Sequence, residues 1–205
     1  MTVNIGDTPQ AGFDEPLKLM SDCHRRVERF LGMLLEVARR RGGALDEAHR
    51  SALTAGLRYF RNAAPWHTQD EEASLFPRLR RCGDAQAKAA MSRIDALEAD
   101  HADAAPIHAE VETLATRWLE AGRLGDADAD LLLRHLTHLQ GVYARHIAVE
   151  DHEIFPLAQR LLSHASLQAV GREMADRRGL DPGLPPRRCR HRLTTRRSDS
   201  ARKGT

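Results

Sequence analysis

The sequence predicts an all-α protein, an up-down-up-down four-helix bundle with a short extra C-terminal helix and a basic disordered tail. Aromatic residues make up only 4% of the 205 residues, whereas strong helix formers such as Ala, Leu, Glu and Arg are abundant. Apolar residues recur at helical spacing over four long stretches. Short joints with glycine or aspartate separate these stretches, so neighbouring helices should run antiparallel.

Residues 1–13 form a flexible lead before the first helix. Asp14 is a suitable N-cap, and Pro16 falls in the first turn, where the missing N–H of proline costs nothing. Apolar residues then continue at helical spacing until Gly42 and Gly43 end the helix.

The second helix is expected from about Asp46 to about Gly83. Pro65 and Pro77 lie inside this stretch. Because proline removes a helical hydrogen bond and its ring clashes with the preceding turn, we expect kinks at both positions.

The third and fourth helices are expected over residues 84–122 and 126–163. Pro106 lies inside the third helix, and the fourth opens at Asp126 or Asp128. These two helices complete the bundle.

The chain divides into a lead (1–13), a bundle domain (14–178) that ends in a short helix over about 166–178, and a tail (179–205). The tail lacks helical periodicity and enough apolar content to fold alone. Between Leu180 and Thr205, eight basic residues stand against two acidic ones, a balance of +6. Since the whole chain carries +2, the remaining 179 residues carry −4, and body and tail should be physically separate.

The ends and cysteines narrow the class of protein. The start lacks a basic segment followed by an apolar run, and no stretch of 18 apolar residues occurs, so we expect a cytoplasmic protein without a membrane span. The three cysteines, Cys23, Cys82 and Cys189, are far apart and lack Cys-x-x-Cys spacing. This pattern argues against a disulfide framework and against a thiolate metal site.

An eleven-residue frame, His-x3-Glu-x4-Phe-Pro, occurs twice in the chain. It begins at His67 and again at His146, and it places Glu71 and Glu150 four residues after these histidines. On a helix, each His and Glu share one face, about 6 Å apart along the axis. Two such pairs facing each other across a bundle would form a dinuclear metal site with carboxylate bridges.

Two further histidines, His24 and His101, lie on the first and third predicted helices. Counted from the nearest inter-helix turn, the four histidines lie 18 to 21 residues away. At about 1.5 Å per residue, all four should lie within about 5 Å of one level. Four imidazoles and two carboxylates at this level suit iron, manganese or zinc.

These residues resemble the hemerythrin-like, or HHE, cation-binding domains, over about residues 15–178. The closest resemblance is to the bacterial branch with His-x3-Glu on both ligand-pair helices. It implies a non-heme di-iron protein with two iron ions, manganese or zinc being less favoured. The implied ligands are His24 and His67 on one iron, His101 and His146 on the other, and Glu71 and Glu150 as bridges.

The chain departs from the oxygen-carrying hemerythrins at two positions. Ala105 stands where they have a second histidine on the third helix, and Asp151, beside Glu150, corresponds to their aspartate. The missing imidazole argues against long-lived oxygen carriage. The resemblance then implies binding of O2, NO or peroxide, or iron handling, in sensing or stress response, and leaves peroxide- or NO-directed turnover open.

The residues seven positions from each histidine, toward the turns, predict a ligand pocket. They are Leu31, Phe60, His108 and Leu139. Three are apolar, as a gas-sized pocket that excludes water requires. His108 and Glu28 are the polar exceptions: either could hydrogen-bond a bound ligand, and Glu28 could be an extra metal ligand.

Other polar and aromatic residues near the motifs have structural interpretations. Asp70 and Glu72 are expected to face solvent or to support the ligands, Cys23 to pack as a buried thiol, and Phe76 and Phe155 to pack between helices. Five histidines without partners at the right level are expected to be exposed: His49, His135, His138, His152 and His164.

A second hypothesis is a metal-free helical interaction or regulatory module that acts through its basic tail. The tail has no aromatic residues for base stacking and no recognisable nucleic-acid module, so a solvated extension is preferred over nucleic-acid binding. In this case the two His/Glu pairs would be surface contacts worth a few tenths of a kcal/mol. That interpretation leaves the repetition unexplained.

Overall fold

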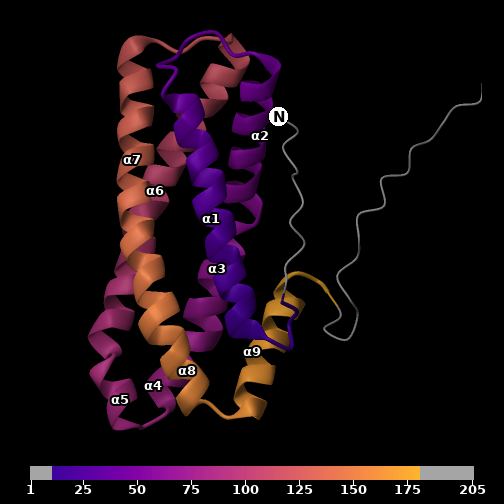
Figure 1. Ribbon diagram of the computed structural model, residues 1–205, viewed down its shortest axis with the longest axis vertical. Helices are drawn as coiled ribbons and strands as arrows, with labels where there is room; N and C mark the ends of the chain where they lie inside the picture. The colour runs from indigo at the N-terminus through magenta and orange to yellow at the C-terminus, as the bar shows by residue number, and fades with distance from the viewer. Residues whose placement is uncertain (1–10, 181–205) are drawn as a thin grey trace, which may run out of the picture.

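The computed structural model describes residues 11–180, which form an all-α four-helix bundle with an additional short helix (Figure 1). The predicted fold class is therefore confirmed, while residues 1–10 and the basic stretch 181–205 lie outside the described residues. The first leg of the bundle is α1 (Pro16–Ala38). The second leg consists of α2 (Glu47–Asn62), α3 (Ala64–Gln69), η1 (Asp70–Leu75) and α4 (Phe76–Arg81), and the third consists of α5 (Ala85–Ala89) and α6 (Met91–Ala121). The fourth leg consists of α7 (Asp126–Val149), η2 (Glu150–Ile154) and α8 (Phe155–Leu161). The additional short helix is α9 (His164–Arg177).

Helices that follow one another in the chain lie side by side in the bundle. α1 packs against α2 and α7, and α6 packs against the same two helices. The α1–α2 and α6–α7 turns lie together at one end, and α9 lies against the lower half of α1 (Figure 1). At the shared turn, the N–H of Leu124 donates to the carbonyl of Gly42, whose φ of 72° and lack of a Cβ allow this approach.

Side-chain caps open three of the helices. Asp46 accepts a hydrogen bond from the N–H of His49 at the start of α2, and Asp84 accepts one from Gln86 at the start of α5. Ser163 caps α9. The predicted cap of the first helix is wrong: the N-cap is Glu15, without a side-chain hydrogen bond, and Pro16 in the first turn determines the helix start.

The second and fourth legs each contain one π-helical turn before a proline. The N–H of Phe76 donates to the carbonyl of Glu71, and that of Phe155 donates to Glu150, in both cases five residues back. Proline cannot donate to the residue four positions earlier and would clash with its carbonyl, so a turn widened by one residue accommodates it. The Phe-Pro end of the repeated frame therefore coincides with a widened turn at each motif glutamate.

The second leg is also interrupted at Ala63, two residues before Pro65. This break and the widened turn correspond to the two kinks predicted from prolines. Pro106, in contrast, is accommodated inside the continuous helix α6.

Two large apolar clusters fill the bundle on either side of one polar layer. On α1, Met20 belongs to one cluster and Leu31 to the other, and His24 lies between them in sequence. On α6, Leu97 and Ala104 flank His101 in the same way. The histidine layer is thus separated from both ends of the bundle by packed hydrocarbon.

Among residues 11–180, no helix is both long and apolar enough to cross a lipid bilayer.

Candidate metal centre

The structure brings all six residues predicted to be metal ligands into one layer of the bundle. Their nitrogen and oxygen atoms form two groups, and within each group the atoms lie within 4.8 Å of one another. The first group consists of His24, His67, Glu71 and Glu150, and the second of Glu71, His101, His146 and Glu150. Because both groups contain the same two glutamates, the arrangement has the geometry of two cation sites that share their carboxylates.

Each glutamate directs one oxygen to each group. Oε1 of Glu71 lies 3.1 Å from Nε2 of His67, and Oε2 lies 3.6 Å from Nε2 of His101. Oε2 of Glu150 lies 3.0 Å from Nε2 of His24, whereas its Oε1 lies 3.2 Å from Nε2 of His146. Both carboxylates are fully buried, so each lies as a bridge between two pairs of imidazoles.

The facing atoms of this layer lack hydrogen-bond partners. The unpaired buried atoms include both carboxylate oxygens of Glu71 and of Glu150, and Nε2 of His24 and of His146. Buried polar atoms are nearly always paired, because an unpaired one loses its hydration without compensation. Converging unpaired imidazole and carboxylate donors therefore fit a pair of hard or borderline cations.

The ionisation behaviour of the layer shows the same need for positive charge. Burial, together with the charge of Glu150, raises the pKa of Glu71 to about 8. Burial would lower the pKa of His24, but the hydrogen bond to Asp151 and the closeness of the Glu150 and Glu71 carboxylates outweigh it and raise this pKa to about 11. In the absence of a cation, Glu71 and His24 would therefore both hold a proton near pH 7. Burial would raise the pKa of Glu150, but the facing imidazoles of His146 and His24 outweigh it and lower this pKa.

Three of the four histidines are supported on their outer nitrogen by a carboxylate. Nδ1 of His24 lies 2.9 Å from Asp151, and Nδ1 of His101 lies 2.8 Å from Glu72. Nδ1 of His146 lies 3.3 Å from Asp100. Such carboxylates orient the ring and increase the electron density on the nitrogen that faces a metal.

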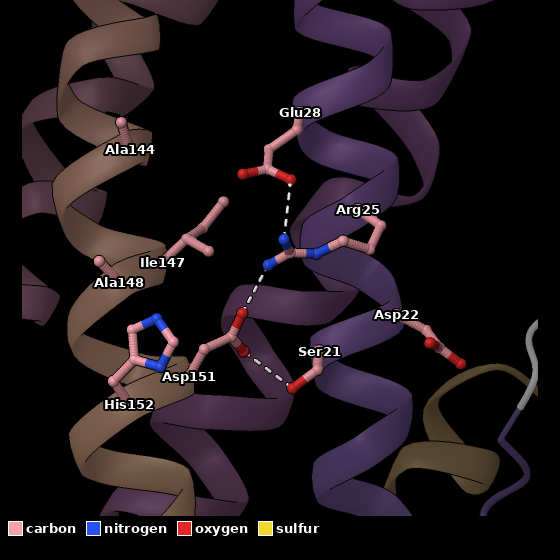
Figure 2. A pocket seen from close by; sticks show the side chains of 9 residues that line it. All are labelled: Ser21, Asp22, Arg25, Glu28, Ala144, Ile147, Ala148, Asp151 and His152. Carbon is pink, nitrogen blue, oxygen red and sulfur yellow. Dashed lines mark hydrogen bonds and ion pairs between the residues drawn. The ribbon is translucent and has the colours of Figure 1, made fainter.

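Asp151 forms the inner wall of a surface groove between α1 and α7. Figure 2 shows Arg25 reaching from α1 between Glu28 and Asp151, with Ser21 directed at the same carboxylate. Arg25 lies 2.5 Å from Asp151, and the hydroxyl of Ser21 donates to it at 2.8 Å. Hydrogen bonds therefore connect this groove to the interior layer through His24.

A mostly apolar cavity of about 380 Å³ opens beside the histidines on the side of the α1–α2 turn. All four motif histidines line it, together with Phe60, Tyr143 and His108. Its lining includes no Asp, Glu, Lys or Arg. The two glutamates are thus shielded from the cavity, whereas the imidazoles face it.

The model of the hemerythrin HHE cation binding domain matches residues 15–158 of the chain. The chain belongs to the hemerythrin HHE cation-binding domain family. An uncharacterized protein of Haemophilus influenzae is 31% identical over 173 residues, which cover 82% of this chain and 92% of the relative. The six donors of the layer all lie within the matched domain, whereas α9 follows it.

The structure corrects several expectations for a hemerythrin-like site. Glu28 points into the surface groove, where it pairs with Arg25 at 3.2 Å, so it does not face the donor layer (Figure 2). Leu31 and Leu139 are buried in an apolar cluster and do not line the cavity, in contrast to Phe60 and His108. Leu31 and Leu139 face inward as predicted, but the cavity does not extend to them.

Two further residues have contacts that differ from the expected ones. Asp70 does not face solvent or support a histidine: it is fully buried and bonded to Arg177 and Arg178 of α9. Phe155, although packed between helices, also stacks on the His24 ring, with centroids 5.4 Å apart. Glu72 does support a histidine, as anticipated.

The remaining predictions concern cysteines and isolated histidines. Cys23 is a buried free thiol, and Cys82 is also free. His138, His152 and His164 are exposed as expected, whereas two others are half-buried beside carboxylates: His49 next to Asp46 and His135 next to Glu110.

Tyr143 and Asp100 are the site residues that sequence reasoning missed. Tyr143 precedes His146 by three residues, and Asp100 immediately precedes His101. The i, i+3 spacing places Tyr143 and His146 on nearby faces of a helix, which was the available signal for the tyrosine. For Asp100, no spacing rule predicts that its side chain reaches the histidine of a neighbouring helix.

Proposed function

We propose that the chain is a non-heme di-iron protein that binds O2, NO or peroxide, or handles iron, in sensing or stress response. The observation that carries this proposal is the bridging position of two fully buried carboxylates between two pairs of imidazoles. His24 and His67 would hold one ion, His101 and His146 the other, and Glu71 and Glu150 would connect them. Bound iron would supply open coordination positions and one-electron redox chemistry at the histidine layer.

The protein contributes orientation, shielding and access to this function. Asp151, Glu72 and Asp100 fix the rings of three histidines from outside. The two apolar clusters exclude water from above and below the layer. The cavity beside the histidines gives a small ligand a path to the layer.

Family membership supports cation binding, and the absence of an imidazole at position 105 favours reactive or sensing roles over oxygen carriage. The alternative, a metal-free interaction module that acts through its tail, predicts no stoichiometric metal. Metal content therefore separates the two functions.

Protein purified without added metal is expected to contain about two iron ions per chain, measured by inductively coupled plasma mass spectrometry. Its near-ultraviolet or visible absorption should change with O2, NO or reductant.

Glu150→Gln should lose most of the metal, because one bridging carboxylate is removed. Glu153→Gln is a matched control, since Glu153 lies in the same turn but pairs with Arg93 at the surface. Equal, negligible metal in wild type and both variants would refute the proposal.

Asp151→Ala is expected to weaken metal affinity by about ten-fold, because His24 loses the acceptor that orients its ring. Competition with a chromophoric chelator would measure this change. Glu28→Ala is the control in the same groove, since Glu28 lines that groove and pairs with Arg25 (Figure 2). An Asp151→Ala affinity within two-fold of the Glu28→Ala affinity would contradict the supporting role of Asp151.

A further inference from the structure

The cavity beside the histidine layer is much larger than a diatomic ligand requires. Its volume is about 380 Å³. One water molecule occupies about 30 Å³ of liquid volume, so the cavity has room for roughly a dozen non-hydrogen atoms. An O2 or NO molecule at the layer would leave most of this space to water or to another molecule.

The exposed residues of the lining place the mouth of the cavity between α3 and α6. Pro65 and Gln69 on α3 and Ala105 on α6 line the cavity and are exposed to solvent. Ala104, also on α6, is buried deeper in the lining. A ligand can thus enter from the side without passing through the packed ends of the bundle.

Besides the four histidines of the layer, the polar residues that line the cavity are Thr68, Gln69 and a hydrogen-bonded pair, His108 and Tyr143. The Tyr143 hydroxyl lies 2.8 Å from Nε2 of His108, and the His108 ring stacks on Phe60 with centroids 4.8 Å apart. Tyr143 is also close to the donor layer, because its ring centroid lies 6.4 Å from that of His146. The pair therefore stands next to any ligand that reaches the histidines.

The chemistry of this pair allows it to serve as donor or acceptor. Burial lowers the pKa of His108 to about 4, and burial raises the pKa of Tyr143, so both groups are neutral near pH 7. If His108 carries its proton on Nε2, it donates to Tyr143 and frees the tyrosine O–H for a ligand oxygen. If Nε2 is unprotonated, Tyr143 donates to His108 and offers only a lone pair.

We propose that this cavity binds a small organic molecule with a two-oxygen head group, a carboxylate or hydroperoxide, and an apolar body of up to about ten non-hydrogen atoms. One oxygen lies at the histidine layer, the other accepts a hydrogen bond from Tyr143, and the body packs on Phe60 and Ala104. The proposal rests on the metal-binding function above, because the lining supplies no charged side chain for an anionic head.

The test uses metal-loaded full-length protein whose metal content has been measured first. Calorimetric titration with azide, acetate, benzoate and cumene hydroperoxide compares a triatomic anion with short and long organic ligands. We expect benzoate or the hydroperoxide to bind at least ten-fold more tightly than acetate, because the ring leaves water for an apolar lining. Tighter binding of benzoate would identify a carboxylate as the preferred head group, and tighter binding of cumene hydroperoxide would identify a hydroperoxide.

Two variants locate the binding site. Ala105→Leu narrows the mouth at an exposed position and should weaken binding of the larger ligand at least ten-fold while azide binding changes less than two-fold. Ala102→Leu, at an exposed position of α6 outside the lining, should leave both affinities unchanged. Equal affinities of acetate, benzoate and hydroperoxide, or an Ala105→Leu effect equal to that of Ala102→Leu, would overturn the proposal.

The tyrosine contact has its own matched control. Tyr143→Phe should weaken binding of the preferred ligand about five- to ten-fold, as expected for one lost hydrogen bond, without changing metal content. Tyr59→Phe removes a buried hydroxyl that faces the carbonyl of Cys23 and lies outside the cavity lining, and it should have no effect on ligand affinity. Equal ligand affinities in the two variants would refute the role of Tyr143. If the purified protein contains no metal, the initial metal measurement instead contradicts the proposed metal-binding function itself.

Discussion

Removal of the bound metal is expected to lower the melting temperature of the protein by roughly 10 °C. Glu71 and Glu150 are fully buried, and their oxygens have no hydrogen-bond partners. Without cations, Glu71 must hold a proton and Glu150 must be neutralised by buried imidazolium groups in place of metal, which costs about 3–5 kcal/mol. In a domain of this size, each kcal/mol corresponds to about 2–4 °C. Thermal unfolding followed by circular dichroism, with and without a strong chelator, measures the change.

A double variant, Glu71→Leu/Glu150→Leu, separates this effect from general damage to the bundle. Leucine fills a similar volume and leaves no buried charge, so the chelator should change the melting temperature of the variant by less than about 3 °C. The metal-free variant should also melt above the metal-free wild type. If the chelator lowers both proteins equally, the stabilisation does not come from the carboxylate layer.

The convergence of the donor layer was predictable from sequence because helices convert residue counts into distances. Each histidine lies 18 to 21 residues from a turn, and a rigid rise of about 1.5 Å per residue places them at one height. The helical face is fixed in the same way for His67 and Glu71, which are four residues apart. Local rules therefore suffice wherever a position depends only on the axis and the phase of one helix.

Two of the three supporting contacts, those of Asp100 and Asp151, were not predictable, because they depend on how neighbouring helices are rotated and on which side chains reach across. The Asp100 carboxylate reaches from α6 to His146 on α7, and Asp151 reaches from η2 to His24 on α1. The π-helical turns shift the phase of the second and fourth legs at Glu71 and Glu150. A wheel drawn for an ideal helix cannot show these shifts, although the prolines that follow indicate where they occur.

The same limitation explains why the position of Asp70, which adjoins Glu71 in the widened turn, differs from the expected one. Asp70 faces away from the donors and is enclosed by α9, whose position no local pattern fixes. Its oxygens accept hydrogen bonds from Arg177 at 2.8 Å and from Arg178 at 2.6 Å. The helix α9, which follows the segment matched by the family, thus holds in place the widened turn that carries Glu71, a candidate metal ligand.

Asp70→Ala is expected to destabilise the metal-free protein by about 3 kcal/mol. The substitution leaves Arg177 and Arg178 without their buried acceptor, and breaking a buried ion pair costs about 3–5 kcal/mol. The lower end of this range applies because both arginine side chains remain partly exposed and can be rehydrated. Urea denaturation of metal-free protein measures the free energy of unfolding without a contribution from bound metal.

Asp95→Ala is the matched control, because Asp95 pairs with Arg80 at the surface. An exposed pair contributes about 0–1 kcal/mol, so this variant should unfold close to wild type. Asp70→Ala should also weaken metal affinity, since loss of the α9 contact loosens the turn that aims Glu71, whereas Asp95→Ala should not. If Asp70→Ala loses stability but retains wild-type metal affinity, α9 stabilises the bundle without positioning the glutamate. If both variants unfold within 1 kcal/mol of wild type, the buried ion cluster does not hold α9 against the bundle.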